Sequence, residues 1–208
     1  MAYRIRSTLI FATVLAVMAG PAFAQKAQMS GKKHDLRAAG NTGDLCGACH
    51  TSHNAGTNYG ALLWNRNTTT ATFTYYNTNV NADFKGGTVD ITAGNKISLL
   101  CMSCHDGTIA LDSVLYTPSG TTFKTGLMTG AAKLSTDLSN DHPVAFSYDS
   151  SVTALPAVYN TTPTLAKLFG ATGTRRVECA SCHDVHAIPS KMLRAPNTNS
   201  QLCLDCHK

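Results

Sequence analysis

The sequence predicts a mostly irregular fold, with short α-helices at four repeated motifs and few short β-strands. The first observation behind this prediction is the motif CxxCH, which occurs four times in 208 residues and accounts for all eight cysteines. The second is the composition between the motifs, which is rich in Thr, Ser, Asn and Gly and includes a single tryptophan, Trp64. Long polar connections of this kind count against an ordinary apolar core. We therefore expect a core that is built around bound groups.

The first 24 residues are expected to be a signal peptide that is removed from the mature chain. Arg4 and Arg6 form a basic start, residues 9–18 are apolar, and the sequence AFA at 22–24 is a small-x-small cleavage site. The apolar stretch is shorter than the roughly 20 residues that a membrane-spanning helix needs, which disfavours the alternative of an uncleaved anchor. We expect residues 25–208 to form one exported domain without a membrane span.

The cysteines form four CxxCH motifs, a pattern that differs from a disulfide framework. The motifs are Cys46/Cys49/His50, Cys101/Cys104/His105, Cys179/Cys182/His183 and Cys203/Cys206/His207. Thiols at positions i and i+3 share one face of a helical turn, where both can form thioethers with one porphyrin while the histidine binds its iron. A zinc ribbon does not require histidine after every CxxC pair. The sequence therefore predicts four covalent haem c groups and the haem-built core of a multihaem cytochrome.

The remaining histidines equal the predicted haems in number. Outside the motifs the chain has His34, His53, His142 and His186. Because each haem iron has a second axial position, this match predicts that every iron has two histidine ligands. Methionine is the competing axial ligand, and Met29, Met128 and Met192 remain as alternatives, whereas Met102 lies inside a motif and cannot readily reach the far side of its own haem.

Two motifs are followed by a second histidine three residues later. His53 follows His50 in this way, and His186 follows His183. Histidines with this spacing lie on the same side of one turn, so they cannot bind opposite faces of one iron. Each second histidine is therefore expected to bind a neighbouring haem. Closely packed haem pairs follow from this expectation, and such pairs are the arrangement that electron transfer needs.

A few regular elements are expected along the chain. Short helices are predicted at three motifs, over 96–105, 176–183 and 201–207. Residues 68–76 are predicted to form a short strand or an extended segment that can pair with 85–91 in a small hairpin, and 117–130 is predicted to be a loop. Pro163 and Gly170 are start and stop signals for a further short helix over the sequence TLAKLF.

The net charge gives no indication of a nucleic-acid partner. It is +5 for the whole sequence, but each predicted haem adds two propionates and, when ferric, one positive charge, so the oxidised holoprotein is close to neutral. A basic chain without such a cofactor would suggest nucleic-acid binding. Arg175 and Arg176, beside the third motif, are candidates to pair with propionates, and the alternative is a solvated charged pair.

The motifs also carry a family resemblance. The four CxxCH motifs, the segment His34-Asp35-Leu36 ahead of CGACHTSHNAG, and the sequence DHPV at 141–144 resemble the doubled-CxxCH multihaem cytochromes. In size and haem number the chain is similar to the extracellular tetrahaem (OmcE-type) cytochromes of metal-reducing bacteria, which polymerise into conductive filaments. The resemblance implies one stacked chain of haems and a histidine of one subunit that binds a haem of the next. It assigns that role to His53, and the alternative is that His53 binds the second haem of its own chain.

The favoured function is electron transfer without catalysis, through closely packed bis-histidine haems. We expect a head-to-tail homopolymer outside the cell or on its surface, with redox proteins or extracellular electron acceptors as partners; the alternative is a soluble periplasmic carrier. A multihaem reductase would need an open iron position, and four spare histidines leave none obvious. A structural or adhesive role finds no support in four haems on a short chain.

Overall fold

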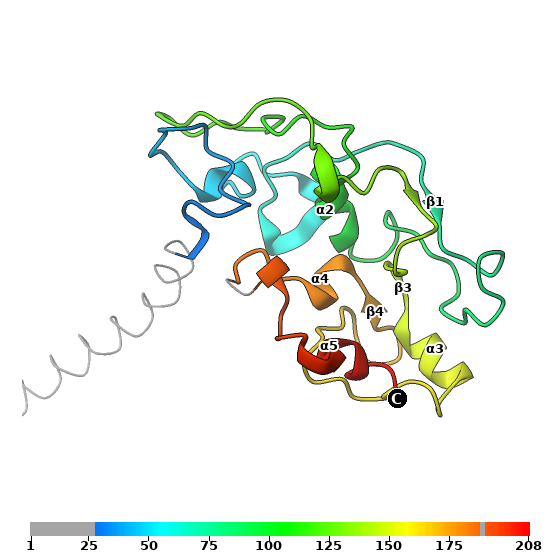
Figure 1. Ribbon diagram of the computed structural model, residues 1–208. Coiled ribbons are helices and arrows are strands. Elements are labelled where there is room, and N and C mark those ends of the chain that lie inside the picture. The colour runs from blue at the N-terminus through cyan, green and yellow to red at the C-terminus, as the bar shows by residue number, and fades with distance from the viewer. Residues whose placement is uncertain (1–27, 188–189) are drawn as a thin grey trace, which may run out of the picture.

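The described chain is mostly irregular, with short helices joined by long loops (Figure 1). The computed structural model describes residues 28–187 and 190–208, so the expected signal peptide lies outside the described residues. The α-helices are α2 (Ile97–His105), α3 (Tyr148–Ala154), α4 (Cys179–Cys182) and α5 (Gln201–Leu204). The 3-10 helices are η1 (Cys46–Ala48), η2 (Thr57–Leu62), η3 (Gly130–Ala132), η4 (Ser190–Met192) and η5 (Thr198–Ser200). Within the described ranges, no helix has the length and apolar character needed to cross a membrane.

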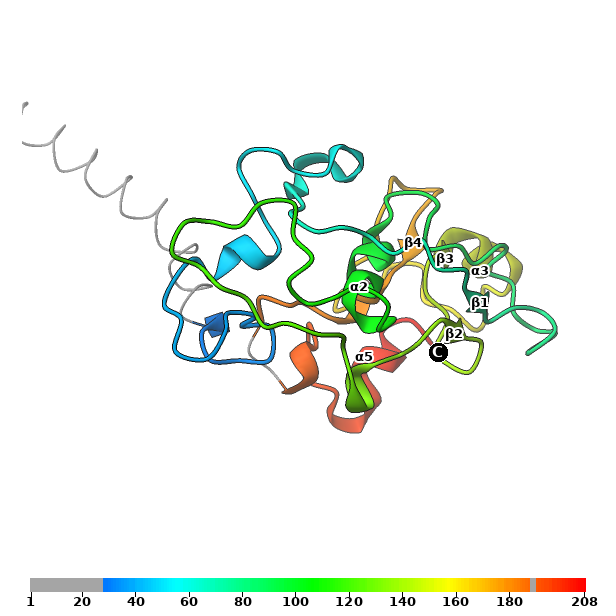
Figure 2. The same cartoon turned by 90° about the horizontal axis from the view of Figure 1, so that it is seen from above.

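Two small sheets lie to one side of α2 in both views (Figures 1 and 2). Strands β1 (Thr74–Tyr75) and β2 (Asp137–Leu138) are parallel, whereas β3 (Phe146–Ser147) and β4 (Arg176–Val177) are antiparallel. The predicted hairpin is therefore wrong, because β1 pairs with β2. Residues 85–91 instead lie beside β3, where the Ser147 N–H donates to the carbonyl of Gly86. A side chain at Gly86 would collide with the ring of Phe146, so the close approach requires glycine.

The helices at the motifs are confirmed in place but are shorter than predicted at two of them. The predicted helix over 96–105 is α2. At the third motif the helix starts later, because Arg176–Val177 forms β4 and Glu178 then caps α4 by a capping box with Ser181. At the fourth motif α5 ends at Leu204. The first motif begins in η1, and the predicted loop over 117–130 is irregular apart from isolated bridges.

The helix predicted over TLAKLF is wrong. The N–H groups of Thr164, Leu165 and Ala166 donate to the carboxylate of Asp205. The residues that follow also form hydrogen bonds with partners outside the segment. The Lys167 N–H donates to the carbonyl of Ser181, and the backbone of Phe169 pairs with that of Arg176. Partners distant in sequence therefore replace the i to i−4 bonds that the local signals favoured.

The buried apolar residues form several small clusters. Ile91, Leu99, Met102, Leu138 and Ala145 form the first, and Val89, Phe146, Tyr148 and Val177 form the second. Leu36, Ala48 and Phe123 form the third, and Ala166, Ala195 and Leu202 form the fourth. Motif residues belong to these clusters or pack against them: Met102 is in the first, Cys49 lies against the third, and Cys206 lies against the second and fourth. Each cluster is therefore local to one or two CxxCH motifs.

Candidate haem-binding sites

Each CxxCH motif forms one helical turn. In the first, third and fourth motifs, the histidine N–H donates to the carbonyl of the first cysteine, at 2.9, 3.1 and 2.9 Å. The second motif lies within α2, where Leu99 and Met102 are buried. A bond between residues four apart closes a turn and brings positions i and i+3 to one face. The two thiols of every motif therefore face the same side, as attachment to one porphyrin requires.

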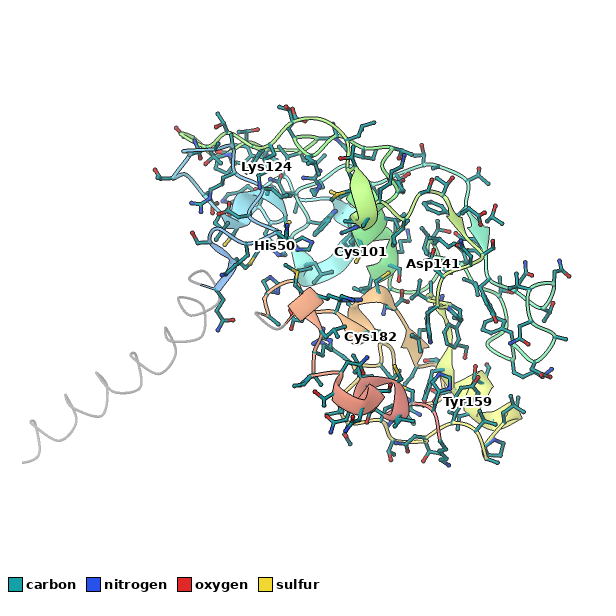
Figure 3. All side chains as sticks on the ribbon, in the orientation of Figure 1. His50, Cys101, Lys124, Asp141, Tyr159 and Cys182 are labelled. Carbon is teal, nitrogen blue, oxygen red and sulfur yellow. The ribbon has the colours of Figure 1, made fainter. Side chains whose placement is uncertain are left out.

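The thiols of successive motifs are neighbours in the order of the sequence. Burial raises the pKa of Cys49 to about 11, and the Cys104 thiol contributes to the increase. A hydrogen bond with Cys179 is the main cause of the raised pKa of Cys101. Burial raises the pKa of Cys182, and Cys203 adds to it. In space, the four motifs therefore follow one another in the order of the sequence. The helices of the second and third motifs, α2 and α4, are in contact. Figure 3 labels His50, Cys101 and Cys182 on these neighbouring segments.

Three histidine pairs have the separation of two ligands on one metal ion. The ring centroids are 6.1 Å apart for His34 and His105, 6.2 Å for His50 and His186, and 6.3 Å for His142 and His207. A histidine nitrogen binds a metal at about 2.0–2.1 Å and lies about 1.1 Å from the ring centroid, so imidazoles on opposite sides of one metal have centroids about 6.3 Å apart. Each pair joins one motif histidine to one spare histidine.

Backbone carbonyls orient the motif histidines. The Nδ1 atoms of His50, His105 and His183 lie 2.6, 2.7 and 2.9 Å from the carbonyl oxygens of Leu62, Ala132 and Lys191. Because a carbonyl oxygen can only accept, Nδ1 carries the proton and Nε2 keeps its lone pair for a metal ion. These carbonyls were beyond sequence prediction, since every residue has a backbone carbonyl and only the fold selects which one is used.

The spare histidines are oriented in a similar way. His142 Nδ1 lies 2.9 Å from the carbonyl oxygen of Pro143, and His186 Nδ1 lies 3.3 Å from a carboxylate oxygen of Asp184. His34 Nδ1 lies 2.9 Å from the sulfur of Met192, one of the methionines considered as a ligand. Burial and, after it, the rings of His105, His186 and His183 lower the pKa of His34 to about 4. His34 is therefore neutral at pH 7, the state that binds a metal.

His53 and His183 remain outside these pairs. Both rings are exposed, and among the described residues neither forms a ring contact with another histidine. A cavity of about 230 Å³ opens beside His183. Its lining includes Tyr75, Val89, Met102, Leu138 and Val177, together with Cys179, Cys182, His183 and His142. Among the described residues, the third motif therefore has an apolar recess and a motif histidine, and the spare histidine in its lining, His142, has its ring paired with that of His207.

The two arginines beside the third motif have protein partners. Arg175 binds the carboxylate of Asp149 at 2.6 Å, and Arg176 binds Glu178 at 3.2 Å. The structure thus favours neither a propionate contact nor a freely solvated pair for these side chains. Two buried donors instead lack a partner among the described residues, Trp64 Nε1 and Arg66 Nε. Sequence reasoning missed Arg66, because nothing in its neighbourhood distinguishes a buried arginine from an exposed one.

Comparison with known proteins identifies the motif. Residues 173–208, which contain the third and fourth CxxCH, match the family model described as the doubled CXXCH motif. A search of curated proteins found no match. The matched motif, together with the irregular fold with short helices, supports a multihaem c-type cytochrome. CxxCH motifs indicate covalently bound haem c, and the doubled motif is typical of proteins that transfer electrons.

Proposed function

We propose that the protein binds four haem c groups, each with two axial histidines, and conducts electrons along them in the order of the motifs. The observation that carries this proposal is the set of three histidine pairs with centroid separations of 6.1–6.3 Å. Haem iron takes up and releases single electrons without an exchange of ligands. The chain's contribution is to orient ligands before they bind, as the carbonyl oxygens do that hold Nδ1 of His50 and His105.

The pairs support an assignment of ligands for three of the haems. His50 and His186 would serve the first haem, His105 and His34 the second, and His207 and His142 the fourth. Since His186 lies three residues after His183, the first and third haems are held close together. The neighbouring thiols of Cys101 and Cys179 support a similar closeness of the second and third haems. Such proximity favours electron transfer between them.

For the third haem we propose a second ligand from another copy of the chain. His183 is its motif histidine, and His53 is the spare histidine left over; both are exposed. If His53 of each copy binds the third haem of the next, the contact is heterologous, and a heterologous contact that does not close gives an open filament. This assembly agrees with the resemblance to extracellular filament cytochromes. We also propose export of the mature chain, 25–208, to the cell surface or beyond.

The second axial position of the third haem also supports a second candidate function. If no second copy binds, the third haem keeps one axial position open, and a multihaem reductase needs such a position. A soluble periplasmic carrier is the remaining alternative, in which the third haem has a ligand from the same chain.

Replacement of His53 by alanine tests these proposals, with Asn54→Gly at the exposed neighbour as the control, because glycine tolerates the positive φ of Asn54. We expect the His53 variant to keep four covalent haems by mass spectrometry, to lose filaments in electron micrographs, and to have one haem with altered axial ligation by electron paramagnetic resonance. The Asn54 variant should form filaments. Normal filaments of the His53 variant, with all irons bis-histidine, would contradict the role of His53. A mass corresponding to fewer than four haems in the wild type would contradict the haem number.

A further inference from the structure

The sulfur of Met192 is the hydrogen-bond acceptor for one of the proposed axial histidines. It lies 2.9 Å from Nδ1 of His34, and both side chains are half-buried. A thioether sulfur has no hydrogen to donate, so Nδ1 carries the proton and Nε2 of His34 keeps its lone pair for iron. Because the rings of His34 and His105 are 6.1 Å apart, the iron concerned is that of the second haem. Met192 therefore contacts the ligand of this haem on the side away from the iron.

This acceptor differs in kind from those of the other histidines. In the described part of the chain, Nδ1 is held by a backbone carbonyl at four of them: His50, His105, His142 and His183. Nδ1 of His186 faces a carboxylate oxygen of Asp184 at 3.3 Å. A thioether sulfur is a weaker acceptor than either kind of oxygen. Among these histidines, His34 therefore has the weakest acceptor at Nδ1.

A strained turn holds the Met192 sulfur in place. Lys191 and Met192 have φ angles of 58° and 55°, in the left-handed region that residues other than glycine rarely adopt. The Met192 carbonyl accepts from the Asp184 N–H at 2.7 Å, and the Lys191 carbonyl oxygen lies 2.9 Å from Nδ1 of His183. Strain of this kind persists where surrounding contacts fix it, and it is concentrated at functional sites. One turn thus presents acceptors to proposed ligands of the second and the third haem.

The acceptor at Nδ1 governs how strongly an imidazole donates to iron. A strong acceptor draws the Nδ1 proton toward itself and makes the ring a more basic ligand. A more basic ligand stabilises ferric iron relative to ferrous iron and lowers the reduction potential, and a weak acceptor has the opposite effect. Reduction adds one electron to the iron, and no ligand or proton is exchanged.

We propose that Met192 is a positioning residue that raises the reduction potential of the second haem, because its thioether leaves His34 a weaker donor than an oxygen acceptor would. This inference rests on the proposed function, since it assumes that His34 and His105 bind one iron. An electron that passes along the motifs is then held more favourably at the second haem than it would be with an oxygen acceptor at this position.

Variants of Met192 separate the acceptor from the packing. Met192→Gln offers an amide oxygen to Nδ1, whereas Met192→Leu keeps an apolar side chain of similar size without an acceptor. The control, Met128→Gln, makes the same substitution at another half-buried methionine. In titrations with dithionite followed by nuclear magnetic resonance, Met192→Gln should lower the equilibrium constant for reduction of the second haem about tenfold, or about 59 mV for one electron. Met192→Leu should leave this constant unchanged or raise it, and the control should leave it unchanged.

The direction of the shift decides between the acceptor and a merely structural role. A decrease of equal size in Met192→Leu and Met192→Gln would overturn the proposal, because loss of structure acts alike in both. Haem count and axial ligation are measured on the same samples by mass spectrometry and electron paramagnetic resonance. Fewer than four haems, or a second haem without two histidines in the wild type, would contradict the proposed function itself. Four bis-histidine haems with an unchanged second potential in Met192→Gln would contradict the role of Met192 alone.

Discussion

At the residue scale, Asp205 organises the chain around the fourth motif. It lies between Cys203 and Cys206, and its carboxylate accepts from the N–H groups of Thr164, Leu165 and Ala166. Burial alone would raise the pKa of Asp205, but these hydrogen bonds lower it below its ordinary value. One acidic side chain thus fixes a polar segment that has no helix of its own.

Replacement of Asp205 by alanine should lower the free energy of unfolding by about 1–3 kcal/mol, because hydrogen bonds to a charged acceptor are lost. The folded-state pKa lies below the unfolded value of about 3.9. The stabilisation is therefore present above pH 4 and is lost as the pH falls through the folded-state pKa. Denaturant titrations at pH 7 and pH 3 measure the difference, with the exposed Asp83→Ala as control. If Asp205→Ala lowers the free energy of unfolding equally at both pH values, the charge of the Asp205 carboxylate does not contribute to stability.

Residue types were predictable from the sequence, but their partners were not. The number of spare histidines predicted bis-histidine ligation, yet nothing local indicates that His34 faces His105 or that His186 faces His50. Those contacts depend on how loops far apart in sequence come together. The position of Arg66 is a further case, since its acceptors are backbone carbonyls of two distant segments.

At the element scale, Glu178 connects the helices of the second and third motifs. It caps α4, and its Oε2 accepts from the hydroxyl of Ser98 at 2.5 Å, near the start of α2. Its Oε1 accepts from Arg176 at 3.2 Å. The Ser98 hydroxyl oxygen in turn accepts from the Cys179 N–H at 3.0 Å. This buried network sets the distance between two attachment helices whose thiols, Cys101 and Cys179, are close enough for Cys179 to raise the pKa of Cys101.

Replacement of Glu178 by alanine should lower the free energy of unfolding by about 3–5 kcal/mol, since it leaves the Arg176 charge and the Ser98 hydroxyl without their partner. Glu178→Gln should cost less, because an amide oxygen can still accept from Ser98. Denaturant titration of the holoprotein measures both, and the exposed Asp112→Ala is the control. Similar stability of the alanine and control variants would contradict the structural role of this network.

The elements themselves were predictable where local signals decide the outcome. The helix at the second motif formed almost as predicted, because apolar residues at Leu99 and Met102 pack on its buried side. The predictions of the hairpin and of the TLAKLF helix were wrong. β1 pairs with a parallel strand from a distant part of the chain, and Asp205, also distant in sequence, binds the backbone of the TLAKLF segment. In a chain with few regular elements, contacts between loops outweigh local propensity.

At the scale of the whole molecule, the motifs form a row, and among the described residues the histidine of the third motif is not paired with the ring of a spare histidine. Successive thiols are neighbours from the first motif to the fourth. The exposed His53 lies three residues beyond the first motif, and the exposed His183 belongs to the third. If a second copy supplies the missing ligand, every copy both donates a histidine and accepts one. Growth of the filament then has a direction.

This directionality predicts that the His53→Ala subunit terminates growing filaments. It retains the third haem and can accept His53 from another copy, but it cannot donate a histidine to the next. A wild-type preparation with about one tenth of the variant should therefore give filaments with a mean length on the order of ten subunits, because each incorporated variant stops growth at one end. Electron micrographs of mixed samples measure the length, and the Asn54→Gly subunit mixed in the same ratio is the control. If lengths in the His53 and Asn54 mixtures are equal, the ligand does not pass between subunits.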